Sequence, residues 1–216
     1  MSIRVFPHGR VEVVVPRRTR PRAVQTFVTS HRDWIDRTAR ELAGDRPRLL
    51  SPERIELAAI RRAWKLRYDP SGGPRPASVV ELPGTLEVRG ADAGGEAGRA
   101  ALRAWLLAQG REYLPARLAR VAARLELGYK RVQIRNQRTR WGSCSATGTI
   151  SLNCCLLFLS PDLVRYLLVH ELCHTRHLDH SPRYWALVER HEPRARTLDR
   201  RLADAWRDVP LWATPL

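Results

Sequence analysis

The segment from His170 to His174 carries the residues of this chain that are best suited to metal chemistry. It reads H-E-x-x-H, with two histidines four positions apart and Glu171 directly after the first. On an α-helix, positions i and i+4 lie on one face about 6 Å apart along the axis, so both imidazoles can reach one ion. A zinc ion accepts this geometry. Glu171 can reach a metal-bound water without being a ligand, and we predict that it acts as the general base.

The residues before this segment predict the helix that the metal site needs. Ser160, Pro161 and Asp162 form a helix start, because serine caps free amides, proline tolerates the first turn and aspartate favours the positive end of the helix dipole. Apolar residues then follow at helical spacing: Leu163, Val164, Leu167, Leu168 and Leu172. The motif is therefore expected on a helix. The alternative is a buried helix that carries two histidines by chance.

A catalytic zinc usually takes three protein ligands and one water, so a third donor is needed. The candidates are His177, His180, Glu189 and Glu192. His177 would lie near the face of the first two histidines if the helix continued, but three ligands along about 10 Å of one helix cannot surround an ion tetrahedrally. Ser181 and Pro182 predict the start of a second helix, which places His180 in the turn between the two helices. His180 is the favoured third ligand.

The H-E-x-x-H motif followed by His180-Ser181-x-x-Tyr184-Trp185 resembles the YgjP-like family of zinc metallopeptidases, which is related to the SprT-like zincins. The resemblance implies a zincin-like fold, a zinc cofactor and His180 as the third ligand. The segment from Arg140 to Cys144, with the strand-like run from Ile150 to Asn153, is similar to a segment that the family carries just before its zinc helix. Arg32 to Ile35 is similar to the family's N-terminal segment.

Three features near the motif allow more than one interpretation. Tyr184 is a candidate contact for the substrate or the transition state, although an aromatic residue near such a helix more often packs. The strand from Trp141 to Ser145 could hold an extended peptide by backbone pairing, or it could only pack under the helix. Cys144 could be a nucleophile paired with a histidine, an interpretation that the explicit metal motif makes less favoured.

Composition sets the broad class. A chain of 216 residues can bury a sizeable core as one domain or two. Its 4 cysteines include no C-x-x-C pair, which argues against a disulfide framework and a four-cysteine zinc site. No run of about 18 apolar residues occurs, and charged residues begin at Arg4. We therefore expect a soluble, cytoplasmic protein without membrane contact.

The formal charge of +16 ordinarily points to nucleic acid or another polyanion as partner. However, Lys65 and Lys130 are the only lysines among 38 basic residues, and such an excess of arginine can also reflect the coding bias of a GC-rich genome. The arginines are spread along the chain without interleaved aromatic residues. Nucleic acid is thus a possible partner beside a peptide or protein substrate. The sequence does not predict the oligomeric state.

The predicted fold is α+β, with a division between residues 92 and 93. Residues 1–92 are predicted to form a β-rich region with one helix, from Ala23 to Leu42. Its strands are expected at Ile3–Phe6, Val11–Val15, Arg54–Leu57, Ala63–Tyr68, Ser78–Leu82 and Thr85–Val88. The first two are predicted to form a hairpin, and the last four could form a meander, although the sequence does not determine their pairing. Residues 93–216 are predicted to form the zincin-like catalytic domain, in which a mixed or antiparallel sheet lies beside the metal-binding helix.

Three further elements of the catalytic part follow from local patterns. The long Ala/Leu/Arg-rich helix from Glu96 to Leu125 should kink or break at Pro115. A final helix is expected from Pro193 to Trp206, and the tail around Trp212 is expected to fold back onto the body.

The leading hypothesis is a zinc-dependent metallopeptidase in which His170, His174 and His180 hold the ion and Glu171 deprotonates its water. A metal-dependent nucleotide pyrophosphatase is the first alternative, which the resemblance also allows, although the sequence has no Walker-type phosphate loop. A basic nucleic-acid-binding protein with a structural zinc is the second. In a structural site, protein ligands occupy all four coordination positions of the zinc, and His177 would be the fourth ligand.

Overall fold

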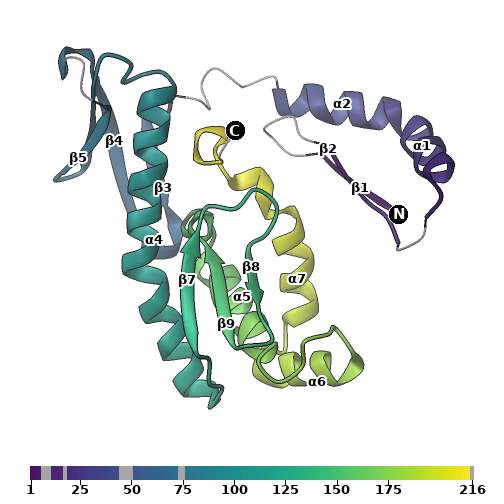
Figure 1. Ribbon diagram of the computed structural model, residues 1–216. Coiled ribbons are helices and arrows are strands. Elements are labelled where there is room, and N and C mark those ends of the chain that lie inside the picture. Colours follow the sequence, from purple (N-terminus) through teal and green to yellow (C-terminus); the bar gives the residue numbers. More distant parts are fainter. Residues whose placement is uncertain (6–10, 17–18, 44–50, 73–75, 215–216) are drawn as a thin grey trace.

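The computed structural model describes residues 1–5, 11–16, 19–43, 51–72 and 76–214 (Figure 1). The described residues form helices and three separate sheets, so the predicted α+β class is confirmed. Among the described residues, no helix is long and apolar enough to cross a membrane.

The N-terminal residues form a hairpin and two helices. Strands β1 (Ser2–Val5) and β2 (Val11–Val14) pair antiparallel as predicted, and residues 6–10 between them lie outside the described part. The single helix that we predicted is two, α1 (Pro21–Ser30) and α2 (Arg32–Ala43). His31 interrupts them with φ −110° and ψ 9°, and its Nδ1 lies 2.8 Å from the Phe27 carbonyl oxygen. This local side-chain bond ends the first helix in a way that apolar spacing cannot predict.

Four strands at the predicted positions form the second sheet: β3 (Arg54–Leu57), β4 (Arg62–Asp69), β5 (Ser78–Leu82) and β6 (Thr85–Arg89). The meander that the sequence allowed is wrong, because the order is β3-β4-β6-β5 and β6 runs parallel to β4. Strand β6 carries the fully buried Leu86 and Val88, whereas β5 has no fully buried residue. The more apolar strand takes the central position, and Gly84, with φ +67°, makes the tight turn that joins the two.

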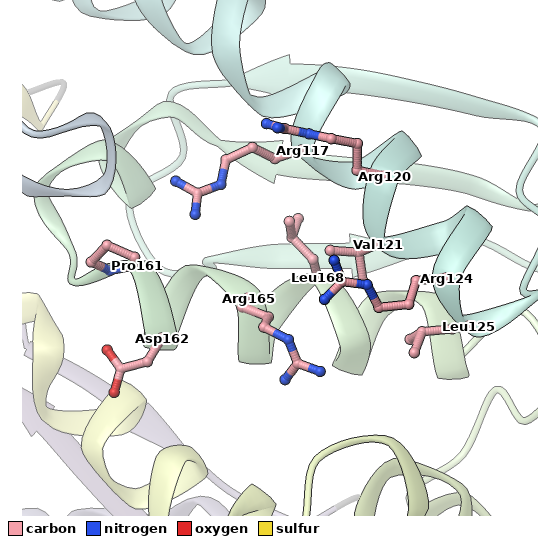
Figure 2. Close-up of a pocket in the computed structure, with 9 residues that line it drawn as sticks. All are labelled: Arg117, Arg120, Val121, Arg124, Leu125, Pro161, Asp162, Arg165 and Leu168. Atoms are coloured by element: carbon pink, nitrogen blue, oxygen red, sulfur yellow. The ribbon is translucent and has the colours of Figure 1, made fainter.

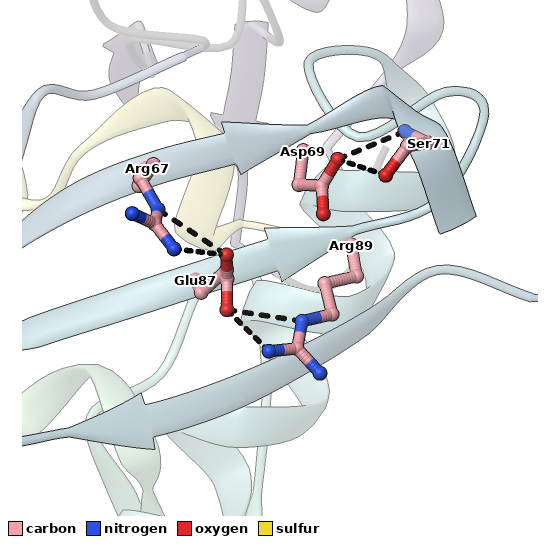
Figure 3. A network of polar contacts seen from close by, with 5 residues as sticks. All are labelled: Arg67, Asp69, Ser71, Glu87 and Arg89. Atoms are coloured by element: carbon pink, nitrogen blue, oxygen red, sulfur yellow. Dashed lines mark hydrogen bonds and ion pairs between the residues drawn. The ribbon is translucent and has the colours of Figure 1, made fainter.

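A buried carboxylate fixes the register of the parallel pair (Figure 3). Glu87 of β6 is 3 % exposed, and it stands opposite Arg67 of β4 in the ladder. Its two oxygens accept hydrogen bonds from Arg67 at 2.6 Å and from Arg89 at 2.5 Å. These bonds hold the pKa of Glu87 below its usual range. Next to them, Asp69 accepts from the backbone and hydroxyl of Ser71 at the end of β4.

The long helix α4 (Glu96–Leu125) contacts both this sheet and the elements of the metal site (Figure 1). It continues through Pro115, so of the predicted kink or break the break does not occur. Leu114 and Leu118, on either side of the proline, are fully buried and hold both halves of the helix against the core. One cluster of buried side chains runs from β6 through α4 to the helix that carries the H-E-x-x-H motif. The division between residues 92 and 93 stays a prediction.

A mixed three-stranded sheet follows: β7 (Arg131–Arg135), β8 (Gly142–Cys144) and β9 (Thr149–Asn153). Strand β9 is central, parallel to β7 and antiparallel to β8, which leaves β8 at an edge. A 3₁₀ turn (Cys154–Phe158) leads from β9 to the helices that follow. These are α5 (Pro161–Cys173), α6 (Pro182–His191) and α7 (Ala195–Asp204). The final helix thus ends earlier than predicted, and Ala205–Asp208 forms a 3₁₀ turn.

Both predicted helix starts lie where expected, but they are capped differently. Ser181 accepts a hydrogen bond from the Tyr184 backbone N–H at 3.4 Å, as an N-cap residue does. The Ser160 hydroxyl instead donates to the Asp162 carboxylate and caps no backbone amide of α5.

At the C-terminal end, Trp212 is fully buried and its carbonyl oxygen accepts from Arg103 of α4 at 3.2 Å. The tail therefore folds back onto the body.

Candidate metal centre

The structure brings the three predicted histidines together at the end of α5. His170 lies in the last turn of this helix, and His174 is the first residue after the helix ends. The chain then turns back, and His180 lies just before α6. The Nε2 atom of His170 is 3.2 Å from that of His174 and 3.4 Å from that of His180. Ligands about 2.05 Å from a tetrahedral zinc are separated by roughly 3.3 Å, so the three nitrogens fit such an ion.

Hydrogen bonds on the far side of two rings leave their Nε2 lone pairs free. The Nδ1 of His174 lies 2.9 Å from the His177 carbonyl oxygen, which only accepts, so Nδ1 carries the ring proton. The Nδ1 of His170 lies 3.4 Å from the Tyr166 hydroxyl. That hydroxyl donates to Asp199 at 2.7 Å and can therefore accept from His170. Both rings thus present Nε2 to the centre in the form that binds metal.

Sequence reasoning missed Tyr166 and Asp199. Tyr166 lies one turn before His170 on α5 and is fully buried, a spacing that a search for ring-orienting residues could have noticed. Asp199 lies on α7, and only the packing of α7 against α5 brings it to this hydroxyl. Asp199 thus accepts from Tyr166, and Tyr166 accepts from His170. Such a chain of hydrogen bonds orients the imidazole of His170 and raises its basicity.

Burial favours the neutral form of His170 and His174, because it lowers the pKa of both rings. It lowers the pKa of His170 to about 3, with smaller contributions from the positive charge that His174 and His180 would carry. The Nε2 lone pairs of the neutral His170 and His174 rings point at each other, and they repel unless a cation lies between them. Among the described residues this is the only group of His, Cys, Asp or Glu side chains close enough together to share an ion. The donor set fits zinc, for which neutral imidazole is a preferred ligand.

Glu171 lies beside this cluster and against the edge strand β8. Its side chain is 3 % exposed, and its Oε2 atom has no hydrogen-bond partner. Burial raises the pKa of Glu171 to about 8, and a cation nearby would lower it again. A buried carboxylate oxygen without a protein partner is costly, and this one therefore indicates a missing polar group at the centre.

The room for this carboxylate comes from Gly142 of β8. A Cβ atom placed on Gly142 would lie 2.5 Å from Oε1 of Glu171. Neighbouring residues hold the glycine in position: the Trp141 indole N–H donates to the Leu202 carbonyl at 3.1 Å, and Asn153 donates to the Arg140 carbonyl at 2.9 Å. The predicted segment from Arg140 to Cys144 thus places the edge strand against Glu171.

Replacing Gly142 with alanine is therefore expected to displace the Glu171 carboxylate. Because the clashing atom is the end of a flexible side chain, the fold should tolerate the change, and the melting temperature and zinc content should stay near wild type. Turnover should fall about 100-fold, as expected when a reacting group moves by roughly 1 Å. Gly94→Ala is the matched control, since a Cβ atom there meets nothing within 4 Å. Wild-type turnover in Gly142→Ala would contradict this role for the glycine.

Tyr184 lies where it supports His170 and His174. It is fully buried, and its ring stacks on His174 with the centroids 4.4 Å apart. Its hydroxyl donates to the His170 carbonyl oxygen at 3.3 Å. This placement favours packing and positioning over the contact with substrate or transition state that was our other interpretation.

The other candidate ligands lie outside the cluster. His177 contributes its backbone carbonyl, as described above. Glu189 pairs with Arg196 at 2.7 Å, and the buried Glu192 pairs with Arg165. Cys144 does not support the nucleophile hypothesis, because burial, with a smaller contribution from Glu171, raises the pKa of its thiol to about 11.

A cavity of about 470 Å³ opens beside His174. The β8–β9 turn (residues 145–148) lines one side, and the segment after α5 (residues 174–176 and Leu178) lines another. Lys130 and Arg176 give it positive charge. A substrate at the metal centre would have this cavity within reach.

Comparison with protein families matches residues 1–205 to the YgjP-like metallopeptidase domain. The chain belongs to the YgjP-like family. Membership supports a metal-dependent hydrolase, and the histidine cluster lies within the matched residues. Among solved structures, the YgjP-like chain is similar to the metallopeptidase zymogen of Pyrococcus abyssi abylysin, with 28% identity, a TM-score of 0.39, and coverage of 42% of this chain and 92% of that one. No curated protein matches it.

Proposed function

We propose that this protein is a zinc-dependent metallopeptidase with a zincin-like site. His170, His174 and His180 are the ligands, and Glu171 is the general base. The observation that carries the proposal is the convergence of three Nε2 atoms at 3.2 and 3.4 Å, the spacing of a tetrahedral zinc site, beside a buried carboxylate oxygen without a partner. Three ligands from one helix end and one turn leave a coordination position open for chemistry.

When bound, zinc would supply Lewis-acid chemistry, because it polarises a carbonyl oxygen and lowers the pKa of a water to about 7. Glu171 accepts the proton of the attacking water at its free Oε2 and delivers it to the leaving amine. Tyr166 and Asp199 keep His170 in the tautomer that presents Nε2. Tyr184 holds the His174 ring by stacking.

The substrate class follows from the strand beside Glu171. Strand β8 is at the edge of its sheet, and the side that does not pair with β9 can bind an extended peptide through backbone hydrogen bonds. Gly142 places this strand against the general base, so a peptide bound there would lie close to the reacting groups. The cavity beside His174 would receive a neighbouring side chain, and Lys130 and Arg176 would favour an acidic one.

The test is hydrolysis of a peptide library by the purified protein, measured by mass spectrometry. We expect one zinc per chain, cleavage that stops when a chelator is added, and recovery when zinc is returned. A parallel panel of nucleoside triphosphates separates this function from the nucleotide pyrophosphatase alternative. Metal-dependent consumption of nucleotides with intact peptides would overturn the peptidase proposal. A bound zinc with four protein ligands would do so as well, in favour of a structural site.

A further inference from the structure

Four arginines surround a second cavity, of about 410 Å³, between α4 and α5 (Figure 2). Arg117, Arg120 and Arg124 project from α4, where spacings of three and four residues place them on one face of the helix. Arg165 projects from α5. The rest of the lining is mostly aliphatic: Val121, Leu125, Pro161 and Leu168, with Asp162 as the one acidic residue.

This cavity is separate from the metal centre. Successive residues of an α-helix are about 100° apart around its axis. Arg165 therefore lies about 140° from His170 and about 180° from His174 around α5. The cavity and the histidine ligands thus occupy opposite faces of the same helix, and a ligand in one does not contact the other.

Two of the four arginines are engaged by the protein itself. Arg165 forms an ion pair with the buried Glu192 of the segment after α6. Arg117 donates a hydrogen bond to the carbonyl oxygen of Ala59, a neutral group that leaves the positive charge of this guanidinium uncompensated.

The other two have no such partner. Within the described part of the chain, Arg120 and Arg124 form neither a hydrogen bond nor an ion pair. Asp162 does not compensate for them, because its carboxylate pairs with Arg201 of α7 at 3.0 Å. Figure 2 shows this carboxylate directed away from the arginines of α4. Three guanidinium charges in one cavity therefore lack a counter-charge from its walls.

The electrostatic consequence appears at Arg117. Burial lowers the pKa of this half-buried side chain, and the positive charges of Arg120 and Arg61 lower it further. Both causes act against the charged form, and the attraction of a bound anion would offset them by favouring that form. Water screens Arg120 and Arg124, which are exposed, so the ligand-free arrangement is tolerated.

We propose that this cavity binds a small ligand that carries two or more linked phosphate groups. A guanidinium presents parallel N–H donors that match two phosphate oxygens, and several adjacent arginines suit a ligand with several adjacent charges. The volume lies within the range of about 300 to 1,000 Å³ that is usual for small-molecule sites. No aromatic side chain lines the cavity within the described residues, so the site recognises the phosphates and does not stack a base.

The test is calorimetric titration of the full-length protein with inorganic tripolyphosphate. We expect saturable binding that weakens as NaCl rises. The double variant Arg120→Gln/Arg124→Gln should bind at least about tenfold more weakly, since it loses two charge-assisted contacts. The control, Arg32→Gln/Arg37→Gln, removes the same charge from exposed positions of α2 and should bind like wild type. Both double variants keep the metal centre, so tripolyphosphate contact with zinc cannot produce a difference between them.

A third variant separates contact geometry from charge. Arg120→Lys/Arg124→Lys keeps both charges but loses the bidentate donors, and its affinity should lie between those of wild type and the glutamine variant. Circular dichroism verifies that each variant is folded. The proposal is overturned if wild type does not bind, if both glutamine variants lose affinity equally, or if a glutamate-rich peptide of matched charge competes as strongly as tripolyphosphate. The last result would assign the cavity to acidic peptides.

Discussion

Glu171→Gln is expected to abolish peptide hydrolysis while leaving the bound zinc in place. Glutamine has the size of glutamate, but its amide cannot accept a proton at neutral pH, so the chemical step should slow by about 10²- to 10⁴-fold. The three histidines are untouched, and zinc content should stay at one ion per chain. Because glutamine fills the same buried space as glutamate, the melting temperature should stay near wild type.

The control for this change is Glu189→Gln. Glu189 lies on α6, is exposed and pairs with Arg196, so its loss should leave turnover unchanged. The measurements are turnover of a cleaved peptide and zinc content by mass spectrometry. Wild-type turnover in Glu171→Gln would exclude this residue as the base, even if the protein proved to be a zinc peptidase.

His180→Ala is expected to lower zinc affinity by more than about 100-fold. Without His180, two imidazoles at one helix end remain and cannot form a tetrahedral frame. The side chain is exposed and lies in a turn, so the metal-free protein should keep its fold. Affinity is measured by competition with a chromogenic chelator, and the fold by circular dichroism without metal.

His177→Ala is the matched comparison, because it removes a histidine three residues away in the same turn. The contact that His177 makes with His174 uses its backbone carbonyl, which alanine keeps. Replacing residues that hydrogen-bond to metal ligands typically lowers metal affinity roughly 10- to 100-fold. The loss of zinc affinity in His177→Ala should therefore be smaller than this. The reverse ranking, with His177→Ala losing the metal and His180→Ala keeping it, would contradict our choice of third ligand.

The predictions that succeeded from sequence rest on local patterns. The strands Arg54–Leu57 and Ser78–Leu82 lie at the predicted residues, because β-rich runs between turn residues report on nearby chain alone. The helix that carries the H-E-x-x-H motif was predicted in the same way, from its proline start and its apolar spacing. Local patterns failed at His31, where one side-chain bond to the preceding turn divides a predicted helix in two.

Pairing and packing were decided only by the tertiary structure. The order β3-β4-β6-β5 depends on which strand buries more apolar surface, and alternation along each strand does not reveal this. Gly142 and Glu171 are 29 positions apart, and Tyr166 and Asp199 are 33 apart, so folding alone brings each pair together. The sequence by itself therefore determined the motif, its ligand candidates and the helix that carries them. The close approach of β8 to Glu171, the carboxylate behind His170 and the arginine cavity between α4 and α5 come from long-range packing, which local periodicity cannot specify.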